Sequence, residues 1–133
     1  MKLVVDTNKL FTFFWKGSLI KKLLFAGHDL YSPEFALQEL ESHKSEIMLK
    51  TKINLEEYEY LKNKLSNNVV FVSLSKYKDQ LTKALSLNPD NPKDVDFLAL
   101  ALKLNASIVS DDKELKNQSE IRVFNKKEYS ELF

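Results

Sequence analysis

Carboxylates at four places in the sequence could bind a divalent metal ion together. Acidic side chains that cluster repel one another, and a hard cation is a counter-charge that keeps them ionised. Ligands that are all oxygen favour Mg²⁺ or Mn²⁺ over zinc or copper. Such ions serve the cleavage of phosphodiester bonds, and the protein need not supply a nucleophile. The acids concerned are Asp6, Glu39, Asp94 and Asp112.

Two of these acids are expected to follow strands of one sheet. Residues 2–5 form an apolar run that ends at Asp6, and residues 107–110 form another that ends at Asp111 and Asp112. Short, continuous apolar runs are typical of strands that are covered on both faces. If both strands are central and parallel, their carboxyl ends share the edge of the sheet where ligands bind.

The other two acids lie near the beginnings of helices. Asp94 falls in the first turn of a helix expected over residues 93–104. Glu39 falls in the second turn of a helix expected over residues 32–50, with serine as N-cap and proline at the first position. Helices that connect parallel strands begin near the carboxyl edge of the sheet, so we expect both acids at that same edge.

The rest of the chain alternates strands with helices. This alternation predicts an α/β fold, a three-layer α/β/α sandwich with a central, mainly parallel sheet of about five strands. No linker or repeat divides the sequence, which indicates a single domain over residues 1–133. Further strands are expected over residues 29–31, 69–72 and 121–124, and further helices over residues 9–15, 18–26, 54–65, 75–87 and 126–132.

The composition excludes several classes of protein. The chain has no cysteine, which rules out disulfides, zinc–thiolate sites and thiol catalysis. Its longest early apolar run, residues 10–15, is far shorter than the ~20 residues of a membrane helix, so we expect a cytoplasmic protein with no membrane contact. The net charge of +1 means that any RNA contact must come from a local patch. Candidate lysines for it are Lys9, Lys16, Lys44, Lys93 and Lys113.

Each acid also has a purely structural explanation. Asp6 could belong to an ordinary turn, because Asp and Asn bond readily to their own backbone. Asp94 could serve only the dipole of the helix that it begins. Asp112 could cap a short turn over residues 113–116, and Glu39 could be a solvated helix residue. No single position decides between these explanations, and the coincidence of four acids favours a common site.

Two neighbouring acids are candidates for additional metal ligands. Asp96 is two residues past Asp94 and therefore points roughly 200° around the helix, although it could reach the site through water. Asp111 competes with Asp112 for the position at the end of the strand.

Aromatic side chains follow Asp6 and could contact RNA. Bases of single-stranded RNA stack on aromatic rings. An apolar cluster on a first helix can equally belong to the core or to a dimer interface. His43 lies four residues past Glu39 and so shares its helix face, where it could touch RNA. The aromatic residues are Phe11, Phe13, Phe14 and Trp15.

The acidic motifs resemble those of the PIN-domain nucleases, over essentially the whole chain. That family opens with an apolar strand ending in Asp-Ser/Thr, as in residues 3–7, and carries a glutamate on a helix after a proline, as in residues 32–40. Its third acid precedes an alanine-rich helix, as in residues 94–101, and its last strand ends in Thr-x-Asp, matched by residues 108–112 with Ser110 in place of threonine. The resemblance assigns the family's acids to Asp6, Glu39, Asp94 and Asp112.

The resemblance implies an endoribonuclease that uses Mg²⁺ or Mn²⁺. Many bacterial and archaeal members look like VapC-type toxins, which implies homodimerisation and a partner antitoxin that blocks the site. Thr7, Asn8 and Ser110 are then candidates to orient the acids or to contact phosphate.

Three alternatives stay open from the sequence. The chain could be an RNA-processing PIN nuclease that is not a toxin, or a non-catalytic RNA-binding PIN module. A phosphoryl-transfer enzyme with Asp6 as nucleophile is a third alternative. Against it, Asn8 replaces the second acid of the Asp-x-Asp-x-Thr motif that such enzymes carry.

Overall fold

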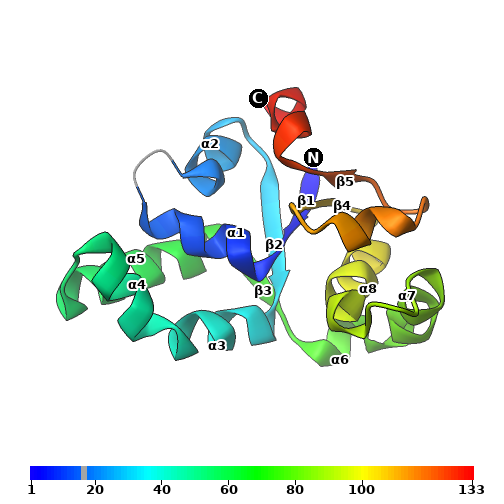
Figure 1. Ribbon diagram of the computed structural model, residues 1–133, viewed down its shortest axis with the longest axis horizontal. Helices are drawn as coiled ribbons and strands as arrows, with labels where there is room; N and C mark the ends of the chain where they lie inside the picture. The colour runs from blue at the N-terminus through cyan, green and yellow to red at the C-terminus, as the bar shows by residue number, and fades with distance from the viewer. Residues whose placement is uncertain (16–17) are drawn as a thin grey trace.

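A parallel sheet of five strands forms the centre of the fold (Figure 1). The computed structural model describes residues 1–15 and 18–133 of the chain. The strands lie in the order β3-β2-β1-β4-β5, and all four neighbouring pairs are parallel. The predicted α/β architecture with a parallel sheet of about five strands is therefore confirmed. The strands are β1 (Lys2–Val5), β2 (Asp29–Pro33), β3 (Val69–Val72), β4 (Ser107–Val109) and β5 (Val123–Phe124).

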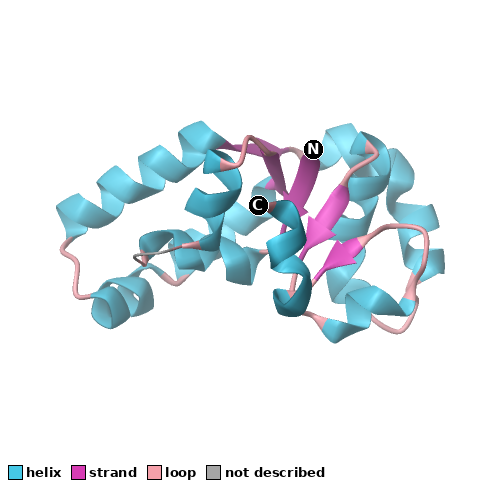
Figure 2. Cartoon of the chain, turned by 90° about the horizontal axis from the view of Figure 1, so that it is seen from above, coloured by secondary structure: helices cyan, strands magenta, loops and turns pink. Residues whose placement is uncertain are grey.

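Helices cover both faces of this sheet and make the two outer layers (Figure 2). One layer contains α1 (Thr7–Phe11), α2 (Leu19–Phe25), α3 (Glu34–Ser42), α4 (Lys44–Thr51) and α5 (Leu55–Asn68), and the other contains α6 (Leu74–Tyr77), α7 (Leu81–Leu87) and α8 (Val95–Leu104). The 3₁₀ turns are η1 (Thr12–Phe14), η2 (Lys78–Gln80), η3 (Pro92–Asp94), η4 (Lys113–Asn117) and η5 (Lys126–Leu132). None of the helices within the described ranges is long and apolar enough to cross a lipid bilayer.

Strand β1 is buried on both faces and divides the apolar core in two. Leu3 and Val5 are fully buried in the core on the side of α1 to α5. Val4 is fully buried in the core on the side of α8. The alternation follows from the period of two along a strand. A strand that is apolar on both faces belongs at the centre of the sheet. The residue that follows β1, Asp6, therefore lies at the middle of the carboxyl edge of the sheet.

Local sequence signals explain two of the helix ends. Asn54 and Glu57 form a capping box at the start of α5. Gly27 ends α2 with φ +87°, and the N–H groups of Gly27 and His28 donate to the carbonyls of Leu24 and Leu23. This pair of hydrogen bonds is a Schellman motif, in which glycine takes the left-handed position at little cost.

The prediction of one helix over residues 32–50 is wrong in two respects. Ser32 is not the N-cap, because β2 continues through Pro33, which pairs with Val72 of β3. The helix begins at Glu34 instead. It also breaks at His43, where φ −101° and ψ 14° separate α3 from α4.

Other predicted helices are interrupted by 3₁₀ turns. The helix expected over residues 75–87 begins at Leu74 and is divided into α6, η2 and α7. The helix expected from residue 93 starts as η3, with Pro92 in its first turn, and becomes α-helical at Val95. Residues 126–132 form η5 rather than an α-helix, and residues 9–15 belong to α1 and η1 apart from Trp15. Strands β4 and β5 are shorter than predicted, because Ser110 and residues 121–122 lie outside them.

Ser32 stabilises the end of the central strand. Its fully buried hydroxyl donates to the carbonyl oxygen of Val5 at 2.9 Å, next to Asp6. The following residue, Pro33, has no N–H to donate.

We therefore expect Ser32→Ala to lower the free energy of unfolding by about 1–2 kcal/mol, because a buried carbonyl loses this donor. Urea denaturation measures the change. Ser42→Ala, which removes an exposed hydroxyl from a carbonyl in α3, is the control and should cost less. Equal effects of the two variants would contradict this role for Ser32.

Candidate active site

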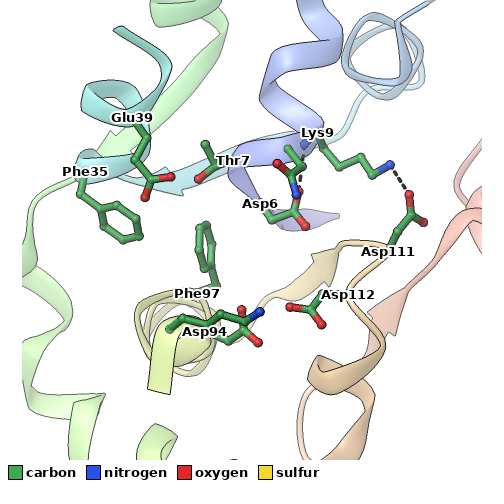
Figure 3. Close-up of a pocket in the computed structure, with 11 residues that line it drawn as sticks. Asp6, Thr7, Lys9, Phe35, Glu39, Asp94, Phe97, Asp111 and Asp112 are labelled. Carbon is green, nitrogen blue, oxygen red and sulfur yellow. Dashed lines mark hydrogen bonds and ion pairs between the residues drawn. The ribbon is translucent and has the colours of Figure 1, made fainter. Parts of the chain in front are cut away.

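A cavity of about 520 Å³ lies at the carboxyl end of the sheet (Figure 3). The four predicted acids reach it from four different elements: the end of β1, helix α3, turn η3, and the segment after β4. The structure therefore brings together carboxylates that are up to 106 residues apart in the sequence, from 6 to 112. The lining residues are Asp6, Thr7, Asn8, Lys9, Phe35, Glu39, Lys93, Asp94, Phe97, Asp111 and Asp112.

The register of the sheet places Asp6 beside Ser110. Val5 pairs with Val109, so the next residue of each strand meets across the edge. The Ser110 hydroxyl donates to Asp6 Oδ2, and the backbone N–H of Lys9 donates to Asp6 Oδ1 at 2.9 Å. Burial raises the pKa of Asp6, and these two hydrogen bonds only partly oppose the rise. Asp6 is thus both the N-cap of α1 and a member of the cavity.

Ser110 ties two of the acids to each other. It is fully buried, and its oxygen accepts the backbone N–H of Asp112 at 3.0 Å while its hydrogen goes to Asp6. One side chain therefore fixes the positions of both strand-end acids. The serine that departs from the family pattern keeps the hydroxyl that this arrangement needs.

Asp94 is the acid whose position has no local structural explanation. Its side chain is only 6% exposed, and within the described part of the chain its Oδ2 atom has no hydrogen-bond partner. Although it stands at the N-cap position of α8, it caps none of the helix N–H groups. Burial, together with the neighbouring Asp112 carboxyl, raises the pKa of Asp94 to about 7. A buried oxygen without a donor is costly unless a cation or another ligand satisfies it.

Glu114 joins this cluster, and sequence analysis missed it. In residues 1–15 and 18–133, the one group of acids whose ligand atoms all lie within 4.8 Å of one another consists of Asp94, Asp112 and Glu114. The backbone N–H of Glu114 also donates to Asp112 Oδ1 at 3.0 Å, so Asp112 does cap η4 as its structural explanation required. Glu114 gave no sequence signal, because it lies within a short turn rather than at a strand end.

Asp111 lines the cavity, but its oxygens have protein partners. It accepts the Lys9 ammonium, the Tyr129 hydroxyl at 2.9 Å and the backbone N–H of Lys126 at 2.8 Å. Burial raises the pKa of Asp111, but the hydrogen bonds from Lys9 and Tyr129 outweigh it and hold the pKa below its ordinary value. Asp111 therefore fastens η5 to α1.

Asp96 lies away from the cavity. Its carboxylate accepts the buried Tyr77 hydroxyl at 2.5 Å, and it is not among the residues that line the acidic cavity. The separation from Asp94 follows from the rotation of two residues along a helix.

The remaining predicted residues occupy the opposite wall. Glu39 is exposed and projects from α3 beside Phe35 (Figure 3). Thr7 is buried, whereas Asn8 is exposed. All of them line the cavity, although Glu39 and Asp6 are not in the tight group around Asp94.

Lysines near the cavity are largely occupied by ion pairs. Lys9 contacts Asp111, and Lys93 lies 3.7 Å from Glu114. Lys44 lies 3.2 Å from Glu59 and 3.7 Å from Glu41. Lys113 is exposed, and Lys16 lies outside the described residues. Lys9, Lys44 and Lys93 therefore bring little unpaired positive charge to the cavity.

The donor set of the cavity fits a hard divalent cation. The candidate ligands are carboxylate oxygens, the type that Mg²⁺ and Mn²⁺ prefer. The unpartnered Asp94 oxygen marks a place where such an ion would satisfy a buried group. Asp94, Asp112 and Glu114 are close enough to hold one ion, and Asp6 and Glu39 face the same space.

Comparisons with known proteins agree with the geometry. Residues 4–128 match the sequence profile of a family described as the PIN domain. No curated protein matches the sequence. Among solved structures, the chain is similar to one in the crystal structure of VapBC2 from Rickettsia felis bound to a DNA fragment from their promoter. That likeness has a TM-score of 0.63 at 16% identity and covers 94% of this chain and 98% of the other, and it shows a shared fold.

The raised pKa of Asp94 predicts a stability change with a defined sign. Between the ordinary pKa of 3.8 and about 7, the folded state keeps a proton that the unfolded state has lost, so stability falls as the pH rises through this window. We expect Asp94→Asn, measured in EDTA, to raise the free energy of unfolding by about 2 kcal/mol at about pH 8.

The gain should shrink as the pH is lowered toward about 4, and urea denaturation at each pH measures it. Asp90→Asn, which neutralises an exposed acid of the preceding loop, is the control and should give no gain. A loss of stability in Asp94→Asn at about pH 8 would show that the Asp94 carboxylate is not under electrostatic strain.

Proposed function

Because the chain belongs to the PIN-domain family, we propose that it is a metal-dependent endoribonuclease that hydrolyses RNA phosphodiester bonds. The observation that carries the proposal is the buried Asp94 oxygen, which lacks a hydrogen-bond partner among the described residues and lies beside Asp112. A structural acid would have a donor at that position. A metal ligand needs its oxygen free for the ion.

The acids have different roles in this proposal. Asp94 and Asp112 hold Mg²⁺ or Mn²⁺, with Glu114 as a further ligand on the same wall. Asp6 and Glu39 complete the site from the opposite side, directly or through water. Asp96 and Asp111 are not needed as ligands, because each has a protein partner.

Neighbouring polar residues hold the acids in position. Ser110 holds Asp6 and the Asp112 backbone in fixed relation. Thr7 and Asn8, which line the cavity next to Asp6, contact phosphate in this proposal. When bound, a divalent cation supplies Lewis acidity toward the phosphodiester and toward an attacking water. The protein contributes carboxylate oxygens held close together, and their ionised form is favoured when the cation is bound.

The proposal extends to a toxin of a VapBC-type pair. The fold likeness to a chain of the Rickettsia felis VapBC2 structure supports this extension. A toxin would act on cytoplasmic RNA and bind an antitoxin protein that blocks the cavity. A homodimer is supported by an exposed apolar surface that includes Phe25, 96% exposed, and Phe133, 58% exposed.

Two other functions compete with the toxin. An RNA-processing PIN nuclease would have the same site without an antitoxin, and an adjacent gene for a small DNA-binding protein would favour the toxin. A non-catalytic RNA-binding module would bind RNA without regard to Mg²⁺ and would not cut it. The unpartnered oxygen of Asp94 favours a metal-dependent enzyme over that module.

The nuclease proposal predicts metal-dependent cleavage that depends on the cavity acids. We expect the wild-type protein to cut single-stranded RNA with Mn²⁺ or Mg²⁺ and not with EDTA. Asp6→Asn and Asp112→Asn should each lower the cleavage rate by about a hundredfold or more. Asp96→Asn is the control, because it makes the same change of Asp to Asn at an acid of α8 that lies outside the cavity, and it should retain activity. Equal, EDTA-resistant cleavage by all four proteins would refute the mechanism.

The position of Ser110 predicts a second effect on metal binding. Ser110→Ala removes the hydroxyl that contacts Asp6 and Asp112, and we expect Mn²⁺ affinity to fall about tenfold to a hundredfold. Ser110→Thr keeps a hydroxyl and should retain most of the affinity. Isothermal titration with Mn²⁺ measures both. Indistinguishable affinities of Ser110→Ala and the wild type would contradict the positioning role.

A further inference from the structure

We propose that the cavity beside the acidic site is a nucleobase-binding subsite that stacks an unpaired base of the RNA substrate on Trp15 and His43. This inference rests on the proposed nuclease function and specifies its substrate as single-stranded RNA. The second cavity has a volume of about 310 Å³ and is formed by α1, Trp15, α3, His43 and α4. Its lining residues include Asn8, Phe11, Trp15, Glu39, His43 and Glu46.

The two cavities share a wall. Asn8 and Glu39 line both, so a strand whose phosphate lies at the acids can place a neighbouring base in the second cavity. The subsite is therefore within a nucleotide or so of the candidate metal ligands. Its volume is at the lower end of ordinary ligand pockets, which suits a small planar group.

The structure separates the four aromatics that follow Asp6 into two pairs. Phe13 and Phe14 are buried in the core, at 1% and 6% exposure. Phe11 and Trp15 line the second cavity, and Trp15 is 38% exposed. An indole that is neither buried in the core nor fully solvated offers an apolar face to a ligand. Aromatic side chains placed this way are the usual platforms for bases of single-stranded RNA.

The break between α3 and α4 supplies the second ring. His43 stands at this break, and its ring contacts Phe11 edge to face, with centroids 5.5 Å apart and planes at 68°. The His43 side chain is 50% exposed and lines the second cavity. Its Nδ1 lies 3.1 Å from a carboxylate oxygen of Glu46. Phe11 and Glu46 thus hold the imidazole in place, which lowers the entropy lost when a base stacks on it.

The charge distribution favours stacking as the source of RNA affinity. Affinity for nucleic acids commonly comes from Lys and Arg that contact phosphates. Here Lys9, Lys44 and Lys93 are already in ion pairs, and Lys50 of the second cavity pairs with Glu46 at 3.0 Å. Because these four lysines are already paired, the metal site and the aromatic surface supply affinity that these lysines do not. Duplex RNA cannot use that surface, because its bases are stacked on one another.

The sequence provides a direct probe, because Trp15 is the single tryptophan of the chain. The experiment titrates a short oligoadenylate into Asp6→Asn with Mn²⁺ and follows tryptophan fluorescence. An abasic oligonucleotide of equal length is the matched ligand, since it has the phosphates but no bases. We expect the oligoadenylate to change the fluorescence of Trp15 and the abasic strand not to. Equal responses to both strands would overturn the subsite.

Variants test whether the rings contribute to affinity. We expect Trp15→Ala and His43→Ala to weaken binding of labelled oligoadenylate about tenfold each, measured by anisotropy, and Trp15→Phe to keep most of the affinity. In the active protein, the same alanine variants should raise KM more than they lower kcat. Tyr60→Ala, which removes an exposed aromatic of α5 outside both cavities, is the control. Unchanged affinity in both alanine variants would overturn the proposal and leave a protein segment as the better occupant.

Failure of the subsite and failure of the nuclease are distinguishable. A wild-type protein that cuts RNA with Mn²⁺ but gives no base-dependent fluorescence change keeps the proposed function and overturns the subsite. A protein that gives the fluorescence change but cuts no RNA overturns the nuclease and supports base binding by Trp15.

Discussion

The burial of the Asp94 carboxylate beside a second carboxylate, that of Asp112, is the constraint on which the rest of the site depends. Asp94 is 6% exposed and lies beside the half-buried Asp112, and burial, together with the neighbouring Asp112 carboxyl, raises the pKa of Asp94 to about 7. Folding alone does not favour this arrangement, since a neutral side chain would cost less. The fold accommodates it because the central strands of the parallel sheet are covered on both faces, and the carboxyl ends of neighbouring strands lie side by side at one edge. In the proposed function, relief of this electrostatic strain would contribute to the affinity for a cation.

The sequence predicted the sheet and the meeting of the acids well, because both follow from strong local patterns. Apolar runs over residues 2–5 and 69–72 match β1 and β3 to the residue. A strand of that kind ends at a defined place, so the location of Asp6 followed from the run before it. Asp94 and Glu39 were located by the direction of connecting helices, which does not require accurate helix ends. This explains why errors at Ser32 and in η3 left the predicted cavity intact.

The features that the sequence did not reveal depend on tertiary contacts. The break at His43 has no proline or glycine to mark it, and the helical pattern continues through it. Phe11 and Phe13 are equally apolar, and only packing decides that one lines a cavity while the other is buried. Glu114 reaches Asp94 because η4 is a tight 3₁₀ turn, and a turn of that kind is set by what surrounds it. Site residues at strand ends are thus more predictable than site residues in turns.

The same helix break links the two halves of the proposed site. Helix α3 carries Glu39 toward the acids, and its end at His43 turns the chain so that α4 forms the far wall of the second cavity. His43 still lies one turn from Glu39, because its N–H donates to the Glu39 carbonyl oxygen at 3.2 Å as in a continuous helix. The bend redirects α4, whose residues Glu46, Ile47 and Lys50 line the second cavity, while Glu39 lines both cavities and the His43 ring contacts Phe11. Chemistry at the acids and selection of an unpaired base would then depend on one backbone feature, because α3 positions a residue of each.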